Sequence, residues 1–368
     1  MDTIGLDLHK RESQLCIIAI DGTITERRIV TSRERVTAVL GDRAPAKILL
    51  EASTESEWVA QHLESLGHAV VVADPNYAPM YATRARRVKT DKRDARTLAD
   101  ALKLGAYHAA HRVSADRRHV RAELAVREAL VRTRTRYVAL AKALVRRDGL
   151  RVAASESHLV AKRLAALELS DALAAELLPL FAILAPINEQ IKAADHRIAA
   201  LTTSDPTVAL VATAPSIGPI TASAIVATVD GVARFQSAHH FEAFLGVVPG
   251  ERSSGEKRRI GRITKAGNAR VRYLLVEAGW RILRSKDPET AALRAWALNI
   301  ASRRGKRIAV VALARRLAGS STRCGATGAR TTPRSSGCHA SVGRKRVDEG
   351  TDDEVIGPYR AGLVVTES

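Results

Sequence analysis

Four acidic residues near the start of the chain have the types and spacing of a metal-binding centre. Asp7 lies mid-strand in GLDLHK, so its side chain points to the opposite face from its leucine neighbours. Glu51 ends the apolar strand KILLE, and Asp91 and Asp94 lie three apart at a helix start, hence on one face. Clustered carboxylates are costly without a cation, and Mg²⁺ held by acids and phosphate oxygens is the usual remedy. The pattern predicts a Mg²⁺ site that polarises a scissile phosphate.

Each acid also has a purely structural interpretation. Asp7 could be an exposed strand residue, and Glu51 a strand end that faces water. Asp91 could cap a helix whose dipole favours Asp94. Placement on two strands and a helix of one sheet domain favours the metal-site interpretation. Four other acids remain possible substitutes in the site: Asp2, Glu55, Glu57 and Asp74.

A second candidate site is the stretch RSSGEKRRIGRITKAGNARVR, residues 252–272, which sets Ser253 and Ser254 before a dense basic run. Eight of its 21 residues are Lys or Arg, and only Glu256 is acidic. Phosphate binding alone needs no paired hydroxyls, whereas a serine activated by a base or a metal is a nucleophile. The alternative is that both hydroxyls only donate hydrogen bonds to DNA. The side chains expected to hold the phosphate are Lys257, Arg258, Arg259, Arg262 and Lys265.

The segment before these serines predicts helices and turns. Pro215-Ser216-Ile217-Gly218-Pro219 separates two apolar helical runs. A glycine turn that opens a helix exposes backbone N–H groups to a phosphate, as in helix-hairpin-helix DNA binders, so Gly218 is a candidate binding residue. An ordinary helix–helix turn is equally compatible with this pattern. FEAFLGVVPG then predicts a helix that stops at Gly246, followed by a turn at Pro249-Gly250 into a polar loop that carries the serines.

The strands and helices that must position the acids are predicted to form an α/β domain. TIGLDLH and SQLCIIAI predict strands, and the Asp21-Gly22 turn leads into TITERRIV to form a hairpin. A helix capped by Ser32, the strand AKILLEAS, a helix closed by Gly67 and the strand HAVVVADP follow. This order is typical of a ribonuclease-H-like (RuvC-like) fold. A generic doubly wound domain fits the second half as well, but the opening hairpin favours the first.

Long helices follow. DKRDARTLADALKLG is expected to end at Gly105, a long helix then runs to Gly149, and a second is expected to break at Pro186. Two such helices could form an antiparallel coiled-coil arm. We therefore expect a RuvC-like domain at 1–110, the arm at 111–205 and an α-rich C-terminal domain at 206–318. Residues 319–368 contain too few large aliphatics for a core, and we expect them to be disordered.

Composition points to a nucleic-acid partner. The 368 residues hold 58 Lys and Arg against 39 acids, a net charge of +19. Such a clustered imbalance favours a polyanion, although an Arg-rich genome could produce solvated surface charge alone. Three cysteines without metal-ligand spacing suit a reducing cytosol. No signal peptide is visible, and no apolar run is expected to reach the length of a membrane helix, so we expect a cytoplasmic, nucleoid-associated protein without a membrane partner.

The chain resembles the IS-one-ten family of insertion-sequence transposases. The resemblance spans residues 1 to about 318 and is carried, in order, by GLDLHK, LLEAS, KTDKRDARTLA, PSIGPITA, FLGVVPGERSSGEKRRIGRITKAGNARVRYLLVEA and RIAVVALARRLAG. It implies a DEDD metal site on Asp7, Glu51, Asp91 and Asp94, and a nucleophilic serine at Ser253, the first of the SSG motif. It also implies a guide (bridge) RNA that pairs with donor and target DNA. In the family the composite site joins two subunits of a homo-oligomer, expected as dimers that assemble to a tetramer.

The resemblance ends near residue 319. Family members continue past ARRLAG with an aromatic-containing helical segment, whereas this chain turns to SSTRCGATGARTTPRSSGCHASVGRKR, the composition of a frameshifted gene. The function we expect is RNA-guided DNA recombination through a phosphoserine–DNA intermediate, with the metal-bound acids activating Ser253. The alternatives are a hydrolytic junction nuclease, in which water attacks instead of serine, and a non-catalytic RNA- or DNA-binding protein.

Overall fold

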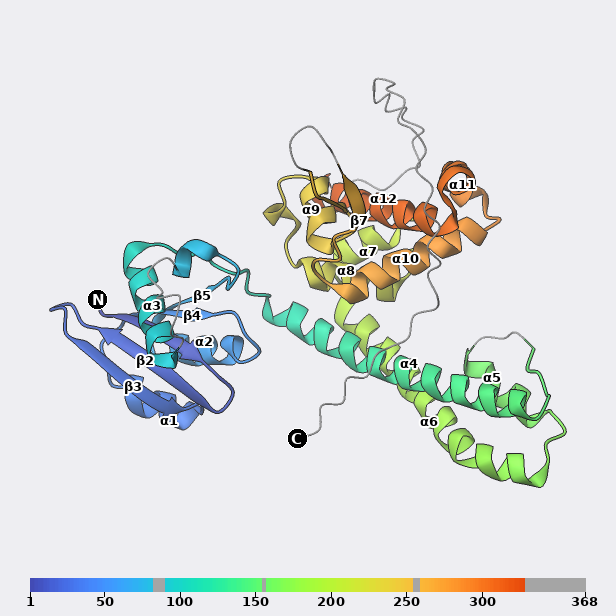
Figure 1. Cartoon of the computed structure of the whole chain (residues 1–368), viewed down its shortest axis with the longest axis horizontal. Helices are drawn as coiled ribbons and strands as arrows, with labels where there is room; N and C mark the ends of the chain where they lie inside the picture. The colour runs from blue at the N-terminus through green and yellow to red at the C-terminus, as the bar shows by residue number, and fades with distance from the viewer. Residues whose placement is uncertain (82–89, 154–156, 254–258, 328–368) are drawn as a thin grey trace, which may run out of the picture.

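The structure is a computed structural model that describes residues 1–81, 90–153, 157–253 and 259–327, the side chains of 321–327 excepted. Figure 1 shows a sheet domain at the N-terminus, two long helices side by side, and a helical body that contains the C-terminal elements. Ser254, Lys257, Arg258 and residues 328–368 lie outside the described residues.

The N-terminal domain is built on a five-stranded sheet in the order β3-β2-β1-β4-β5. Strands β1 and β2 pair antiparallel, as do β2 and β3, whereas β4 runs parallel to both β1 and β5. This mixed sheet with helices is compatible with the expected ribonuclease-H-like domain. Its strands are β1 (Thr3–Leu8), β2 (Glu12–Ile18), β3 (Ile24–Val30), β4 (Lys47–Glu51) and β5 (Ala69–Ala73).

The helices of this domain begin and end close to the predicted signals. They are α1 (Arg33–Leu40), α2 (Ser56–Ser65), the short η1 (Ala78–Tyr81) and α3 (Asp91–Leu104). The Ser32 hydroxyl accepts a hydrogen bond from the Arg35 N–H, which confirms it as the cap of α1. Gly105 ends α3 with a φ of 66°, a left-handed conformation that glycine adopts without strain. Apolar side chains from the sheet, α1 and α2 form a fully buried core that includes Ile4, Ile48 and Leu63.

Two long helices, α4 (Ala115–Arg147) and α6 (Asp171–Thr202), pack antiparallel. The start of α4 meets the end of α6 at Val120 and Ile198, and the other ends meet beside η2 (Ser157–Leu159) and α5 (Val160–Ala165). The break predicted at Pro186 is wrong, because α6 continues through it. Burial of the flanking Leu184 and Ile187 offsets the hydrogen bond that a proline removes.

Helix α6 also corrects the expectation about apolar runs. Among the described helices it is the one that is long and apolar enough to cross a membrane, with a mean hydropathy of 1.4 in its most apolar window. Length and composition alone meet that criterion, and a core helix of a soluble protein meets it as well. In this structure α6 buries one side along α4.

The C-terminal body consists mainly of helices around one core. Its elements are α7 (Pro206–Ala212), α8 (Pro219–Val229), η3 (Val232–Arg234), α9 (Ala238–Leu245), β6 (Pro249–Glu251), β7 (Ile260–Ile263), α10 (Ala269–Arg284), η4 (Pro288–Thr290), α11 (Ala291–Arg304) and α12 (Lys306–Thr327). The core gathers α8, which is buried along its whole length except near its start, with Phe241, Leu275 and Leu313 from the surrounding helices.

Two expectations about this body are corrected. Pro249-Gly250 does not turn into a loop but begins β6, which pairs antiparallel with β7; the partner strand lies beyond the loop and gives no local signal. Helix α12 runs to Thr327, so the expectation that residues 319–368 are disordered is wrong for residues 319–327. Extending an existing helix needs no new nucleus, so residues too polar for a core can still continue one.

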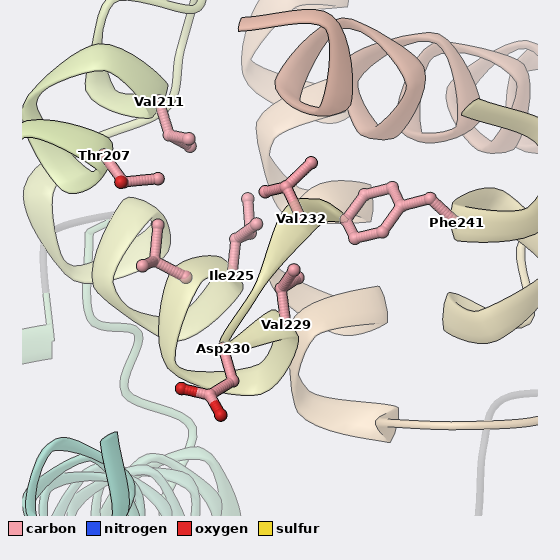
Figure 2. A pocket seen from close by; sticks show the side chains of 8 residues that line it. Thr207, Val211, Ile225, Val229, Asp230, Val232 and Phe241 are labelled. Carbon is pink, nitrogen blue, oxygen red and sulfur yellow. The ribbon is translucent and has the colours of Figure 1, made fainter. Parts of the chain in front are cut away.

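A salt-bridged junction joins the sheet domain, α4 and the C-terminal body. Asp230, at the end of α8, accepts hydrogen bonds from His111 Nε2 (2.9 Å), from Ser114 N–H (3.1 Å) and from Ser114 Oγ (2.7 Å). Arg112 meanwhile pairs with Glu57 of α2. Figure 2 shows the Asp230 carboxylate at the edge of a small pocket whose other labelled side chains are all apolar except Thr207. This pocket therefore lacks the grouped acids expected of the catalytic centre.

Candidate active site

The sheet brings Asp7 and Glu51 side by side. Strands β1 and β4 are parallel neighbours with Leu6 opposite Leu50, so the next residue of each strand is an acid at the same level. Both acids thus lie at the carboxyl end of the strands, where open α/β sheets bind ligands. Tyr81, which the sequence gave no reason to select, donates its hydroxyl proton to Glu51 Oε1 at 2.7 Å and orients that carboxylate.

Helix α3 brings the other two acids to the same place. Asp91 and Asp94 occupy its first turn, and Thr90 rather than Asp91 caps the helix by accepting a bond from the Arg93 N–H. The helix crosses β1 directly over Gly5. A Cβ added there would lie 2.0 Å from the Ala95 carbonyl oxygen and 2.4 Å from the Ala99 nitrogen. Gly5 therefore sets how closely α3, and with it the acids, can approach the sheet.

Asp7 lies at the centre of this group. Only 13% of its side chain is exposed. Its Oδ2 is buried and accepts no hydrogen bond from the described residues. Burial is the largest cause that raises the pKa of Asp7, to about 6; His9 opposes the shift, whereas Asp94, Asp91 and Glu51 add to it. The other three predicted acids thus lie near enough to act on the charge of Asp7, and the exposed-strand interpretation of Asp7 is wrong.

His9 is a member of the group that sequence reasoning missed. Its Nε2 lies 3.3 Å from Asp7 Oδ2 and 3.7 Å from Asp91 Oδ1. Ligand atoms of these three residues all lie within 4.8 Å of one another, a spacing that could hold a metal ion. The signal that could have identified His9 from the sequence was its position two residues after Asp7, at the end of a predicted strand.

The four possible substitutes have other partners. Glu57 pairs with Arg112 and Arg118, and Asp2 pairs with Arg43. Glu55 accepts a bond from the Trp58 indole N–H, and Asp74 accepts one from Asn76. None of the four appears among the charges that act on Asp7. The structure therefore favours Asp7, Glu51, Asp91 and Asp94 as the acidic group.

Ser253 lies just after β6, outside any helix, as expected. Its exposed Oγ donates a hydrogen bond to Glu251 Oε1 at 2.8 Å. Glu251 was not selected from the sequence, although a carboxylate two residues before a serine is a recognisable candidate base. The hairpin holds this pair in place, because the Arg252 N–H donates to the Arg259 carbonyl at 2.9 Å.

Three other predicted phosphate-binding residues that the structure describes lie on the same hairpin or just after it. Arg262 is exposed on β7, and Arg259 is exposed just before that strand. Lys265 follows in a turn with a φ of 56°. That turn packs tightly on the end of α9, since a Cβ on Gly246 would lie 2.0 Å from the Ala266 carbonyl. Gly218 precedes α8 in a separate helix–helix turn, with open space around it.

The structure does not bring the serine and the acids together. Figure 1 shows the β6–β7 hairpin on the C-terminal body, whereas β1, β4 and α3 lie in the separate N-terminal domain. Each half of the predicted chemistry is thus assembled within its own part of one chain.

Comparison with known proteins identifies these two parts. A DEDD transposase model matches residues 4–147, and a model described as "Transposase IS116/IS110/IS902 family" matches residues 208–294. The chain belongs to the IS116/IS110/IS902 family of transposases. As an insertion-sequence transposase, it is an enzyme of DNA strand transfer. The first model contains the acidic group of this transposase, and the second contains its serine hairpin.

Several bacterial relatives resemble this transposase over most of their length. A probable family 20 transposase of Pseudomonas aeruginosa is 27% identical over 85% of this chain and 94% of its own. The transposase for insertion sequence element IS1328 of Yersinia enterocolitica is 27% identical, over 86% and 94%. The transposase for IS1111A of Coxiella burnetii is 25% identical, over 84% and 86%. The likeness therefore extends across both parts of the chain.

Proposed function

We propose that this transposase is an RNA-guided DNA recombinase that cuts and rejoins DNA with Ser253 as nucleophile and a metal-bound acidic group. The observation that carries the proposal is the buried Asp7 Oδ2, which accepts no hydrogen bond from the described residues, with three further carboxylates near enough to act on its charge. The resemblance to the family supports the guide RNA and the choice of Ser253.

The acidic group fits a divalent cation. An orphaned carboxylate oxygen with three further acids nearby is an arrangement that a cation stabilises. Asp7, Glu51, Asp91 and Asp94 would hold the ion, for which we propose Mg²⁺. When bound, it would offset negative charge on the scissile phosphate. Tyr81 keeps Glu51 oriented toward this group by its hydrogen bond.

The serine hairpin supplies the covalent step. Glu251 already accepts the Ser253 hydroxyl hydrogen, so it can take that proton as Oγ attacks phosphorus. The Oγ–P bond forms, the P–O3′ bond breaks, and the 3′ oxygen leaves with a proton. The 3′-hydroxyl of the exchanged strand then attacks phosphorus, and the P–Oγ bond breaks as Ser253 recovers its proton. The number of phosphodiester bonds is unchanged, so the exchange needs no nucleotide triphosphate.

The two halves would meet between copies of the chain. Because the serine and the acids occupy separate parts of one chain, we propose that a second copy completes each site, in dimers that assemble to a tetramer. The division into a RuvC-like domain at 1–110, a coiled-coil arm at 111–205 and a serine domain at 206–318 belongs to this proposal. In it, the tail from 319 plays no part in catalysis.

The basic residues would bind the nucleic acids. Arg259, Arg262 and Lys265 would hold the phosphates beside Ser253, and the same role is proposed for Lys257 and Arg258. The Gly218 turn would bind a phosphate at the start of α8, as in helix-hairpin-helix proteins. Base pairing of the guide RNA with donor and target DNA would select the sequence. The protein would therefore act with the nucleoid in the bacterial cytoplasm.

Trapping a covalent adduct tests the serine. The full chain, purified with the RNA that accompanies it, is incubated with labelled DNA that carries the element's ends and with Mg²⁺, then denatured and resolved by electrophoresis. Wild-type protein is expected to retain label, and Ser253→Ala to retain none. Glu251→Gln should slow adduct formation by roughly 100-fold, the usual contribution of a general base. Cleavage without any adduct would show that water attacks instead, as in a junction nuclease.

Sequencing the copurified RNA tests the guide. One abundant RNA that carries segments complementary to the element's ends and to its target site is expected. If the RNA is a mixture of cellular transcripts without such segments, the guided part of the proposal fails, and the serine chemistry is unaffected.

A further inference from the structure

The imidazole of His9 borders the acidic group. The four acids offer only oxygen ligands to a metal ion, whereas His9 offers a nitrogen. Its Nε2 lies 3.3 Å from Asp7 Oδ2 and 3.7 Å from Asp91 Oδ1. Neighbouring ligands of an octahedral ion lie roughly 3 Å apart. The two distances from His9 are near that spacing, and ligand atoms of all three residues lie within 4.8 Å of one another.

The backbone of His9 is anchored at this place. Thr31, just past the end of β3, donates its hydroxyl proton to the His9 carbonyl oxygen at 2.8 Å. Since that proton is used, the 2.7 Å contact between Thr31 Oγ1 and the buried Ser13 hydroxyl has Ser13 as donor. A buried hydroxyl of β2 thus fixes Thr31, and Thr31 fixes the turn that presents the imidazole.

The chemistry of a nitrogen donor differs from that of the acids. Mg²⁺ prefers oxygen ligands and retains water, whereas Mn²⁺ and later first-row ions accept imidazole readily. The exposed position of His9, with 56% of its side chain accessible, leaves it free to rotate onto an ion. An imidazole beside three or four carboxylates would raise the affinity for Mn²⁺ more than that for Mg²⁺.

We propose that His9 is a ligand of the metal centre and that it shifts the ion preference of this transposase from Mg²⁺ toward Mn²⁺. The inference rests on the proposed metal centre and adds to it a residue outside the DEDD set. The alternative role for His9 is a protonated counter-ion of the acids, which would compete with a metal rather than bind it.

Pulsed electron paramagnetic resonance of Mn²⁺ added to the full chain distinguishes the two roles. A ligating imidazole couples its ¹⁴N nucleus to the Mn²⁺ spin, so wild-type protein is expected to show ¹⁴N modulation and His9→Ala to lose it. The control is His119→Ala, which removes an exposed histidine of α4 far from the acids along the chain and should retain the signal. Wild-type Mn²⁺ spectra without ¹⁴N modulation would overturn the proposal.

Titration calorimetry with each ion alone provides the second measurement. His9→Ala should weaken Mn²⁺ binding by about tenfold or more and Mg²⁺ binding by less than about threefold. If both ions instead bind more tightly to His9→Ala, His9 is a counter-ion and the inference is wrong. The variant Asp7→Asn distinguishes a failure of the His9 proposal from a failure of the proposed metal centre. If that variant loses Mn²⁺ while His9→Ala does not, the acidic centre stands and only the role of His9 fails. If wild-type protein binds neither ion, both fail.

Discussion

Replacing Asp7 with asparagine is expected to stabilise the metal-free protein at neutral pH. The folded chain buries the Asp7 carboxylate near three other acids and gives its Oδ2 no hydrogen bond among the described residues. Its charged form is therefore disfavoured on folding, whereas asparagine has nearly the same shape and no charge. The stability gained on removing this acid would measure how much the assembled acidic group destabilises the folded protein.

The size of the stability gain and its pH dependence follow from the pKa of Asp7, which burial raises from 3.8 to about 6. Such a shift corresponds to about 3 kcal/mol, and partial solvent access lowers the expected gain to about 1–3 kcal/mol. The folded state binds the proton more tightly than the unfolded state. The stabilisation from protonated Asp7 is therefore fully present below pH 3.8 and is lost as the pH rises through about 6. The advantage of Asp7→Asn should be small near pH 4 and complete at pH 8.

Urea denaturation with a metal chelator, at both pH values, measures the difference in the free energy of unfolding. The matched control is Asp42→Asn, which neutralises an exposed acid in the turn after α1 and should change stability by under about 0.5 kcal/mol at either pH. Adding Mg²⁺ at pH 8 should then stabilise the wild-type chain but not Asp7→Asn. A destabilised Asp7→Asn variant, or a gain equal at both pH values, would refute this account of the acidic group.

Two further predictions concern packing. Gly5→Ala should destabilise the sheet domain by about 3 kcal/mol and lower its melting temperature, because the new methyl group meets the backbone of α3; Gly231→Ala, with nothing within 4 Å, is the control. Equal melting temperatures for the two variants would contradict the close crossing of α3 over β1. At the junction, a double-mutant cycle between Ser114→Ala and Asp230→Ala should give a coupling energy of about 1 kcal/mol from the hydrogen bond that Ser114 Oγ donates to Asp230 Oδ1; additive effects would show that this side-chain bond stabilises nothing.

Local signals determined most of the N-terminal domain. Alternating apolar residues specified the strands, the Asp21-Gly22 turn joined β2 to β3, and Ser32 and Gly105 marked where α1 begins and α3 ends. Each of these signals acts within a few residues, so the sequence alone displays it. The types of the four acids and of Ser253 were equally plain, and they carried the resemblance to the family.

Long-range packing decided what the local signals could not. Helix α6 continues through Pro186 because its neighbours are buried against α4, and β6 exists because β7 pairs with it across the serine loop. Neither partner is near in sequence. The same distance explains why Tyr81 was missed as a partner of Glu51. Glu251 lies only two residues before Ser253 and could have been found from the sequence.

The acidic group shows most clearly which features follow from the sequence and which from tertiary packing. The sequence determined that acids end two strands and begin a helix. Only the parallel pairing of β1 with β4, and the crossing of α3 over Gly5, placed Asp7 beside Glu51 and Asp94 and added His9 to the group. The tertiary structure likewise placed Ser253 in another part of the molecule. Residue types are local properties of a chain, whereas the pKa of Asp7 is raised chiefly by burial and further by neighbouring acids, and only folding produces both.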